Sequence, residues 1–379
     1  MRSVNAIIQE LDRIVSHPRV MLEKYLGKGK KVVGCFPIYI PEELVHAGGM
    51  IPMGIWGGQV SPAIAGKYSP TFTCSIMRSC MEFGLTGKYQ GLSCVLLSVL
   101  CDTFRGTSQS WRIGVKDIPI IPFIQPQNRE SKAAKEYLIA EYRSVRNRLE
   151  EITGCKITDH ALSKSIEVYN RHNQTMREFA EVANEHLDVV SAKNRHAVMK
   201  SSHFMEKAEH TGIVQELIAG LKALPVCEWK GKKVILTGIT AEPNELLDIF
   251  TANKIAVVGD DLAQESRQFR TDIPDGDNPM ERLTDQWFLR KGCSLVFESH
   301  RCRGDMLINQ LKENNADGIV VCLMKFCDIE EYEYPIIAQQ IEDAGYPTLC
   351  IEIDQSTQDN EQSRTKIQSF TEMINDRRP

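Results

Sequence analysis

The chain has 379 residues, more than one hydrophobic core usually organises, so its length predicts at least two domains. Its 45 basic and 50 acidic residues give a formal net charge of -5 without a long block of Lys and Arg, so we expect no nucleic-acid partner. The amino-terminal segment lacks the apolar core of a signal peptide, and no run approaches the ~18 apolar residues of a membrane span. These features predict a cytoplasmic protein without membrane association, whose thiols stay reduced.

The first part of the chain alternates short apolar runs with segments of helical periodicity. After an amino-terminal helix, the pattern predicts strands at 31–36, 51–56, 94–100 and 118–123, with helices that begin near Pro41, Cys74 and Asp102. Residues 128–225 then show helical periodicity and many charges, as in "KAAKEYLIAEYRSVRNRLEEI". This middle stretch predicts a helical connector.

The last part of the chain repeats the alternation. We predict strands at 233–238, 255–261, 294–297, 317–324 and 347–354, and helices near 243–253, near 278–290, from about 330 and from about 360. The runs "GKKVVGCF" and "GKKVILTG" begin the two series and indicate the first strands of two related units. Strands that alternate with helices of this length form parallel sheets covered on both faces. We therefore predict an α/β fold in which two Rossmann- or flavodoxin-like parallel-sheet domains, 1–127 and 226–379, are joined by a helical domain at 128–225.

The 12 cysteines contain no pair with CxxC spacing, which argues against a zinc ribbon, a thioredoxin motif or a ferredoxin-type loop. Cys101 and Cys327 each follow an apolar run and precede an aspartate, in "VLLSVLCD" and "VVCLMKFCD". Both lie where the carboxyl ends of parallel strands form a ligand crevice. Cys74 opens a predicted helix, where the backbone N–H groups and the helix dipole favour a thiolate. These three cysteines are therefore candidates for a metal or cluster site.

Several neighbouring residues have simpler interpretations. Cysteine is often a small buried hydrophobe, and we interpret five of the cysteines in this way, namely Cys35, Cys80, Cys94, Cys322 and Cys350. We expect Asp102 and Asp328 to cap helices. We interpret His46 as a hydrogen-bonded core or interface histidine, and Glu42 and Glu43 as carboxylates that complement a helix dipole.

Other charged segments keep two interpretations. The run "GDDLAQESRQFR" is either an element of the cleft or an ion-pair network. Arg78 either neutralises an anion or a cluster, or lies on a solvated face. The sequence contains neither a Walker loop nor a Gly-x-Gly-x-x-Gly motif, so it supports neither ATP hydrolysis nor nicotinamide binding by this chain.

The chain resembles the smaller, beta-type subunit of the 2-hydroxyacyl-CoA dehydratases, a family related to benzoyl-CoA reductase subunits. The resemblance covers essentially the whole length. It rests on "GCFPIYIPEELVHAGGMIPMGIWGG", "CSIMRSC", "LCDTFRG", "QPQNRE", "DDLAQESRQFRTD", "LMKFCDIEEYEYP" and "EIDQSTQDNEQSRTKIQSF".

The resemblance implies a heterodimer with a larger alpha-type subunit, in which each subunit holds a [4Fe-4S] cluster through three cysteines. Here the matching positions are Cys74, Cys101 and Cys327. It also implies a separate ATP-hydrolysing iron–sulfur activator that injects one electron. The substrate, an (R)-2-hydroxyacyl-CoA, then loses water through a ketyl radical to give a 2-enoyl-CoA. The cluster of this chain is expected to relay electrons. Flavin occurs in some relatives but has no supporting motif here.

Two alternatives remain at this point. A homomeric ATP-coupled reductase with a double-cubane cluster has related domains and cysteines, and it would carry about twice the iron per chain. A bilobal small-molecule-binding protein without a cluster would be colourless. Such a protein would tolerate Cys101→Ser with only a packing cost.

Overall fold

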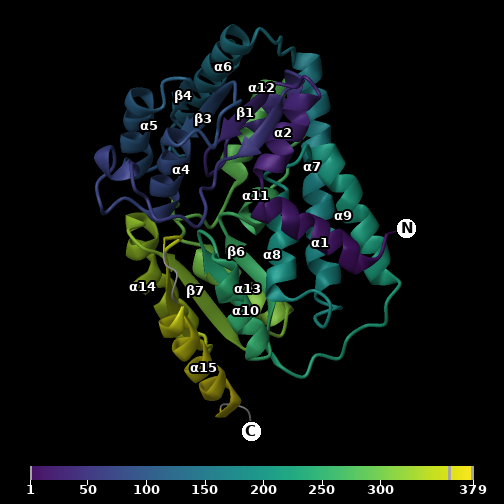
Figure 1. The fold of residues 1–379 in the computed structure, drawn as a ribbon. Coiled ribbons are helices and arrows are strands. Elements are labelled where there is room, and N and C mark those ends of the chain that lie inside the picture. The colour runs from purple at the N-terminus through teal and green to yellow at the C-terminus, as the bar shows by residue number, and fades with distance from the viewer. Residues whose placement is uncertain (1, 357–359, 377–379) are drawn as a thin grey trace.

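Two four-stranded parallel sheets organise the computed structural model, which describes residues 2–356 and 360–376 (Figure 1). The first sheet has the order β2-β1-β3-β4, with β1 (Val32–Cys35), β2 (Ile51–Gly54), β3 (Cys94–Ser98) and β4 (Ile120–Phe123). The second has the order β6-β5-β7-β8, with β5 (Lys232–Gly238), β6 (Ile255–Leu262), β7 (Gly318–Met324) and β8 (Thr348–Ile353). The predicted α/β class is confirmed, and the two sheets share one topology.

The strands form where short apolar runs can be buried on both faces. In β3 all five residues are buried, as expected for a strand inside a covered parallel sheet. The strand predicted at 294–297 is wrong. Leu295 and Val296 are buried, but the segment is a loop that makes one isolated bridge, between Asn128 and Phe297. A short apolar run fits a packed loop as well as a strand, and periodicity alone does not separate them.

The helices between the sheets in sequence are long and amphipathic. They are α6 (Ala134–Thr153), α7 (Asp159–Ala183), α8 (Ala192–Ser201) and α9 (Lys207–Lys222). Gly154, with φ 68°, ends α6, and Thr158 caps α7 by accepting a hydrogen bond from the N–H of Ala161 at 3.2 Å. The helix α7 packs along α9, and α1 (Val4–Ser16) crosses α8 and α9 (Figure 1).

The remaining helices surround the two sheets. They are α2 (Arg19–Gly27), α3 (Glu42–Ala47), the 3-10 turn η1 (Ala65–Lys67), α4 (Ser75–Leu85), α5 (Asp102–Gly114), α10 (Asn244–Ala252), α11 (Ser266–Phe269), α12 (Pro279–Leu289), α13 (Arg303–Glu313), α14 (Asp328–Asp343) and α15 (Glu361–Asp376). The sequence did not predict α11 or α13. Within the described residues, no helix is both long and apolar enough to cross a membrane.

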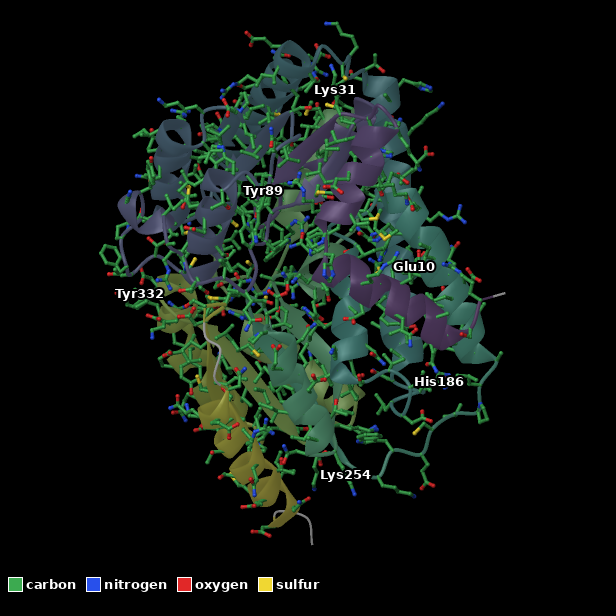
Figure 2. The ribbon with its side chains drawn as sticks, viewed as in Figure 1. Glu10, Lys31, Tyr89, His186, Lys254 and Tyr332 are labelled. Carbon is green, nitrogen blue, oxygen red and sulfur yellow. The ribbon has the colours of Figure 1, made fainter. Side chains whose placement is uncertain are left out.

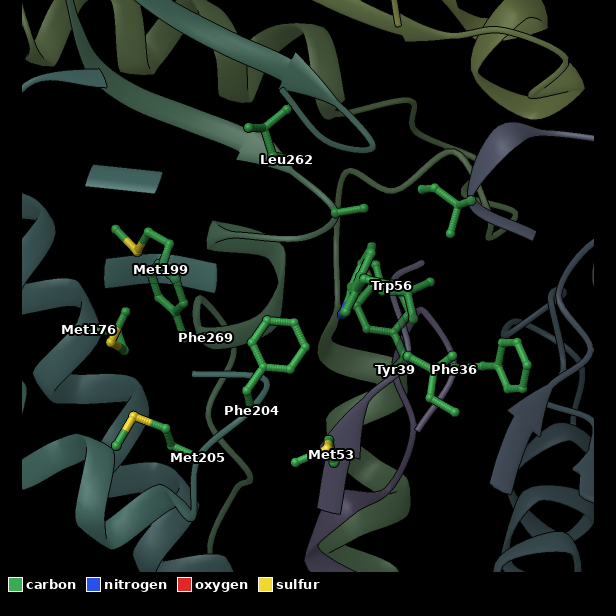
Figure 3. Close-up of a cluster of buried hydrophobic side chains, with 14 of the residues drawn as sticks. Phe36, Tyr39, Met53, Trp56, Met176, Met199, Phe204, Met205, Leu262 and Phe269 are labelled. Carbon is green, nitrogen blue, oxygen red and sulfur yellow. The ribbon is translucent and has the colours of Figure 1, made fainter. Parts of the chain in front are cut away.

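A continuous core joins the two sheets. Figure 3 shows aromatic and methionine side chains from the ends of the first sheet, among them Tyr39 and Trp56, beside Phe204 and Phe269 from later segments. All four belong to the same buried cluster. The two sheets therefore meet across packed side chains, and their carboxyl ends border the same region of the molecule.

Candidate functional site

Cys74, Cys101 and Cys327 line one cavity of about 390 Å³. Each occupies the residue that caps a helix: Cys74 precedes α4, Cys101 precedes α5 and Cys327 precedes α14. The helices α4 and α5 belong to the part of the chain that forms the first sheet, and α14 belongs to the part that forms the second. Residues that the sequence singled out separately thus border a common space.

The topology explains why the cavity forms here. In each sheet the chain leaves its first strand to one side and later crosses to the other, and ligands bind beyond the carboxyl ends of strands at such a switch point. Segments that follow β1, β3, β5, β6 and β7 supply much of the lining, including Ile38, Leu100, Ile239, Ala263 and Phe326. The cavity therefore occupies the ligand crevice of both sheets at once.

The mouth of the cavity is aromatic. Tyr332, which lines the cavity from the first turns of α14, is 83% exposed and lies at the surface where α14 begins (Figure 2). Trp56 and Phe104 contribute aromatic surface deeper in the lining, where both are buried. The space is thus apolar inside and reachable from the surface.

Burial dominates the electrostatics of the three thiols. It raises the pKa of Cys74 to about 12, against the backbone N–H groups of Met77 and Ile76, which favour the thiolate. Burial also raises the pKa of Cys101 and of Cys327, and N–H groups at the start of each helix oppose it. The charges of Cys74 and Cys101 further raise the pKa of Cys327, so the thiols interact electrostatically. Thiolates here need a positively charged partner to neutralise them.

The residues that line the cavity include three thiols, the ligand type that iron–sulfur clusters use. Across residues 2–356 and 360–376, no three His, Cys, Asp or Glu side chains come together as ligands of one ion would. A [4Fe-4S] cluster takes one thiolate at each of several iron corners, so its ligands lie farther apart. Three thiols around an apolar cavity are compatible with that arrangement.

A buried ion network holds the start of α14, the helix that Cys327 caps. Asp261, at the end of β6, accepts hydrogen bonds from Arg267 at 2.9 Å and from Arg303 at 2.8 Å. The same two arginines bind Glu330, in the first turn of α14, at 3.2 Å and 3.0 Å. Burial opposes ionisation of Asp261, but the charges of Arg267, Arg303 and Arg270 hold its pKa well below the usual range. The run "GDDLAQESRQFR" is therefore part of an ion-pair network, and it also contributes Ala263 to the lining of the cavity, so both interpretations hold.

The comparison with known proteins agrees with the site. The family described as "2-hydroxyglutaryl-CoA dehydratase, D-component" matches residues 37–374. The chain belongs to the family of 2-hydroxyacyl-CoA dehydratase beta subunits. The resemblance found in the sequence motifs is thereby confirmed.

Three relatives match this dehydratase beta-subunit chain over nearly its whole length. It is 47% identical over 377 residues to lactoyl-CoA dehydratase subunit beta of Anaerotignum propionicum, covering 99% of this chain and 100% of the relative. It is 40% identical over 375 residues to the (R)-phenyllactyl-CoA dehydratase beta subunit of Clostridium sporogenes, covering 99% and 100%. It is 37% identical over 378 residues to (R)-2-hydroxyglutaryl-CoA dehydratase, subunit beta, of Acidaminococcus fermentans, covering 98% and 100%.

The expected capping role of the two aspartates in this family member is wrong by one position. Cys101 and Cys327 occupy the capping positions, and Asp102 and Asp328 are the first residues of α5 and α14. Their carboxylates still lie at the positive end of each helix dipole. β3 ends at Ser98 and β7 at Met324, so a short link follows each strand. The last residue of each link is the cysteine, which takes the position that the sequence rules give to aspartate.

The cysteines predicted to be core residues are mostly buried. Cys35, Cys80, Cys94 and Cys322 are buried, and the Cys80 thiol donates to the carbonyl of Ile55 at 3.5 Å. Cys350 is a correction, because it is only partly buried. It lies on β8, an edge strand of the second sheet, where one neighbour is missing.

The structure confirms the interpretation of His46. Its Nδ1 lies 2.9 Å from the Ser165 hydroxyl and its Nε2 lies 3.2 Å from the Glu206 carboxylate. Glu42 begins α3 as expected, and its carboxylate also accepts a hydrogen bond from the Tyr169 hydroxyl at 3.1 Å. These residues hold α3 against α7 and α9.

Arg78 lies on α4, one turn beyond Cys74, and its side chain is 19% exposed. Its guanidinium lies 3.8 Å from the Asp354 carboxylate, and its buried Nε has no hydrogen-bond partner. Burial raises the pKa of Cys74, and the positive charge of Arg78 acts in the opposite direction. The interpretation of Arg78 as a solvated residue is therefore wrong.

Proposed function

We propose that this chain is the iron–sulfur, beta-type subunit of a 2-hydroxyacyl-CoA dehydratase, and that Cys74, Cys101 and Cys327 each bind one iron of a [4Fe-4S] cluster. The observation that carries the proposal is that thiols at three helix starts, two beside the first sheet and one beside the second, line one apolar cavity. A [4Fe-4S] cluster is a cofactor held by cysteine thiolates. The full-length similarity to three dehydratase beta subunits supports the same assignment.

The residues of this chain have three tasks in the proposal. The thiolates hold the cluster, which when bound supplies one-electron transfer. Backbone N–H groups of Met77, Phe104 and Glu330 face the sulfur charges and stabilise them. The apolar part of the lining, with Leu100 and Met324, limits the contact of the sulfurs with water.

The proposed partners follow from the same comparisons. The relatives are named as beta subunits, which supports an alpha-type partner and hence a heterodimer. The lack of a Walker loop in this sequence supports a separate ATP-hydrolysing iron–sulfur activator as the source of the electron. We assign this cluster an electron relay, with elimination of water from the 2-hydroxyacyl-CoA completed together with the alpha-type subunit. The three relatives are named for three different acyl groups, so we propose the class of substrate and not one acyl group.

Iron and acid-labile sulfide per chain, measured on anaerobically isolated protein, test the proposal. We expect about four irons per chain, with loss of the cluster in Cys74→Ser, Cys101→Ser and Cys327→Ser. Cys302→Ser is the matched control, because Cys302 also caps a helix but does not line the cavity. That variant should keep its iron.

Two other results would contradict the proposal. About eight irons per chain would favour the homomeric double-cubane reductase. A folded chain that stays free of iron after anaerobic reconstitution would favour the binding protein without a cluster.

A further inference from the structure

A single buried glutamine ties the start of α4 to the second sheet. Gln355 follows β8 and is 2% exposed. Its backbone N–H donates to the Ser75 hydroxyl at 3.0 Å, and its carboxamide oxygen accepts from the Ser79 hydroxyl at 3.0 Å. Its carboxamide nitrogen donates to the carbonyl of Trp56 at 3.2 Å and to the carboxylate of Glu242 at 2.8 Å. Gln355 therefore joins the end of β8 to three other segments, which carry Trp56, α4 and Glu242.

These contacts lie beside two of the candidate ligands. Ser75 directly follows Cys74, and its hydroxyl donates to the sulfur of Met324 at 3.3 Å. Met324 is the last residue of β7, the strand that leads to Cys327. Met324 also lines the cavity. The Gln355 contacts thus tie α4, which Cys74 caps, to the end of β8, and β8 pairs with β7, the strand that leads to Cys327.

The backbone around this contact is shaped to admit it. Gly57 has φ +68°, a conformation that L side chains rarely adopt. A Cβ atom at Gly57 would overlap the Ser79 hydroxyl and lie 3.1 Å from the carboxamide oxygen of Gln355. The absence of a side chain at this position leaves room for the hydrogen bond between Ser79 and Gln355.

We propose that Gln355 is a positioning residue, which fixes the separation of Cys74 and Cys327 and so slows the loss of the cluster. The inference rests on the proposed function, because it assumes that both cysteines bind iron. Three thiolates hold a cluster firmly only if their helix starts keep one relative position. Residues that orient metal ligands in this way typically change metal affinity 10- to 100-fold when they are replaced.

Gln355→Met tests the proposal, because methionine has a similar length and no carboxamide. Gln286→Met is the matched control. Gln286 is also buried, and its carboxamide bonds the carbonyl of Thr271 at 2.8 Å and the guanidinium of Arg290 at 3.0 Å, but it does not line the cavity. The measurements are the rate of iron transfer from the anaerobically isolated full chain to a chelator, the electron paramagnetic resonance spectrum of the reduced cluster, and the thermal unfolding of the iron-free chains.

We expect iron loss roughly 10- to 100-fold faster in Gln355→Met, with an altered spectrum, and a rate close to wild type in Gln286→Met. The midpoint temperature of thermal unfolding should fall by similar amounts in both variants. A difference in iron loss between two variants of similar stability then indicates a positioning role and not a general loss of stability. Should Gln355→Met fail to fold, Ser79→Ala removes the hydroxyl that binds the carboxamide oxygen, together with its contacts to the carbonyl of Ile76 at 2.9 Å and the N–H of Gly58 at 3.3 Å. This variant should itself release iron faster than wild type.

Equal rates of iron loss in Gln355→Met and wild type would overturn the positioning role. If only Ser79→Ala folds, equal rates in Ser79→Ala and wild type would overturn it. The proposed function would survive that result, provided that the wild-type chain holds about four irons. A wild-type chain without iron would instead overturn the proposed function itself, and this inference with it.

Discussion

Because of the ion network at the start of α14, Glu330→Gln should destabilise the fold strongly, although the two side chains have the same size. Glu330 is 3% exposed, and its two oxygens accept hydrogen bonds from Arg267, Arg303 and the Ser294 hydroxyl. The network balances three arginines against three carboxylates, namely Arg267, Arg270 and Arg303 against Asp261, Glu330 and Glu333. A glutamine leaves one buried positive charge without compensation, and its NH2 group faces a guanidinium. Removing one partner of a buried pair costs about 3–5 kcal/mol, so we expect a loss of that size in the free energy of unfolding.

Urea unfolding at neutral pH measures this loss, with Glu331→Gln as the control. Glu331 is the next residue of the same helix but is exposed, so its replacement should change stability by about 0.5 kcal/mol or less. Arg267→Gln combined with Glu330→Gln restores the charge balance, and the double variant should lose less than the sum of the single losses. A Glu330→Gln variant as stable as Glu331→Gln would refute the account of the network, and so would strictly additive losses.

Three further predictions concern stability. Burial raises the pKa of Glu43 to about 7 from 4.5, so the folded chain keeps this proton to higher pH than the unfolded chain and loses stability as pH rises between those values. The free energy of unfolding of Glu43→Gln, measured in urea, should therefore rise relative to that of wild type by about 3 kcal/mol from pH 4.5 to pH 8. Free energies of the two proteins that change in parallel with pH would contradict the raised pKa of Glu43. Gly57→Ala should lower the free energy of unfolding by roughly 1–3 kcal/mol, because the alanine is strained at a positive φ and overlaps Ser79. Gly87→Ala, at φ +76° with open space, should be destabilised by the backbone strain alone. Trp111→Ala, at a fully buried position, should cost about 3–5 kcal/mol in the same assay, and a loss below about 1 kcal/mol would argue against its place in the core.

The sequence predicts the sheets well because its strands are short, apolar and separated by helices. The lysine-rich starts "GKKVVGCF" and "GKKVILTG" each contain the first strand of a sheet, and the two sheets have the same strand order. The prediction failed at 294–297, where tertiary packing buries an apolar loop, and at α13, which the apolar spacing did not reveal. The domain limits at 127 and 225 stay predictions.

Candidate ligands are easier to predict than the residues that support them. A thiol at the end of a buried strand is visible in the sequence, because strand ends and helix starts follow local rules. Glu330, Arg303 and Gln355 carry no such local signal. Their roles depend on partners tens to hundreds of residues away, as in the contact between Gln355 and Ser75, which are 280 positions apart. Only the folded chain brings these groups together.

The shared topology also shows how the two halves differ at the cavity. Cys74 caps α4, the helix before β3, and Cys302 caps α13, the helix before β7, so the two cysteines hold equivalent places. Cys74 lines the cavity, whereas the Cys302 thiol donates to the Glu298 carboxylate at 3.2 Å. The residue after Cys302 is Arg303, which binds Glu330 in the helix that Cys327 caps. The start of α4 thus supplies a candidate ligand, Cys74. The equivalent start of α13 supplies Arg303, which supports the helix that carries the candidate ligand Cys327. Four cysteines cap helices around the two sheets, namely Cys74, Cys101, Cys302 and Cys327, and the repeated fold brings all but Cys302 to the cavity. These four cysteines therefore leave one corner of the proposed cluster without a thiolate.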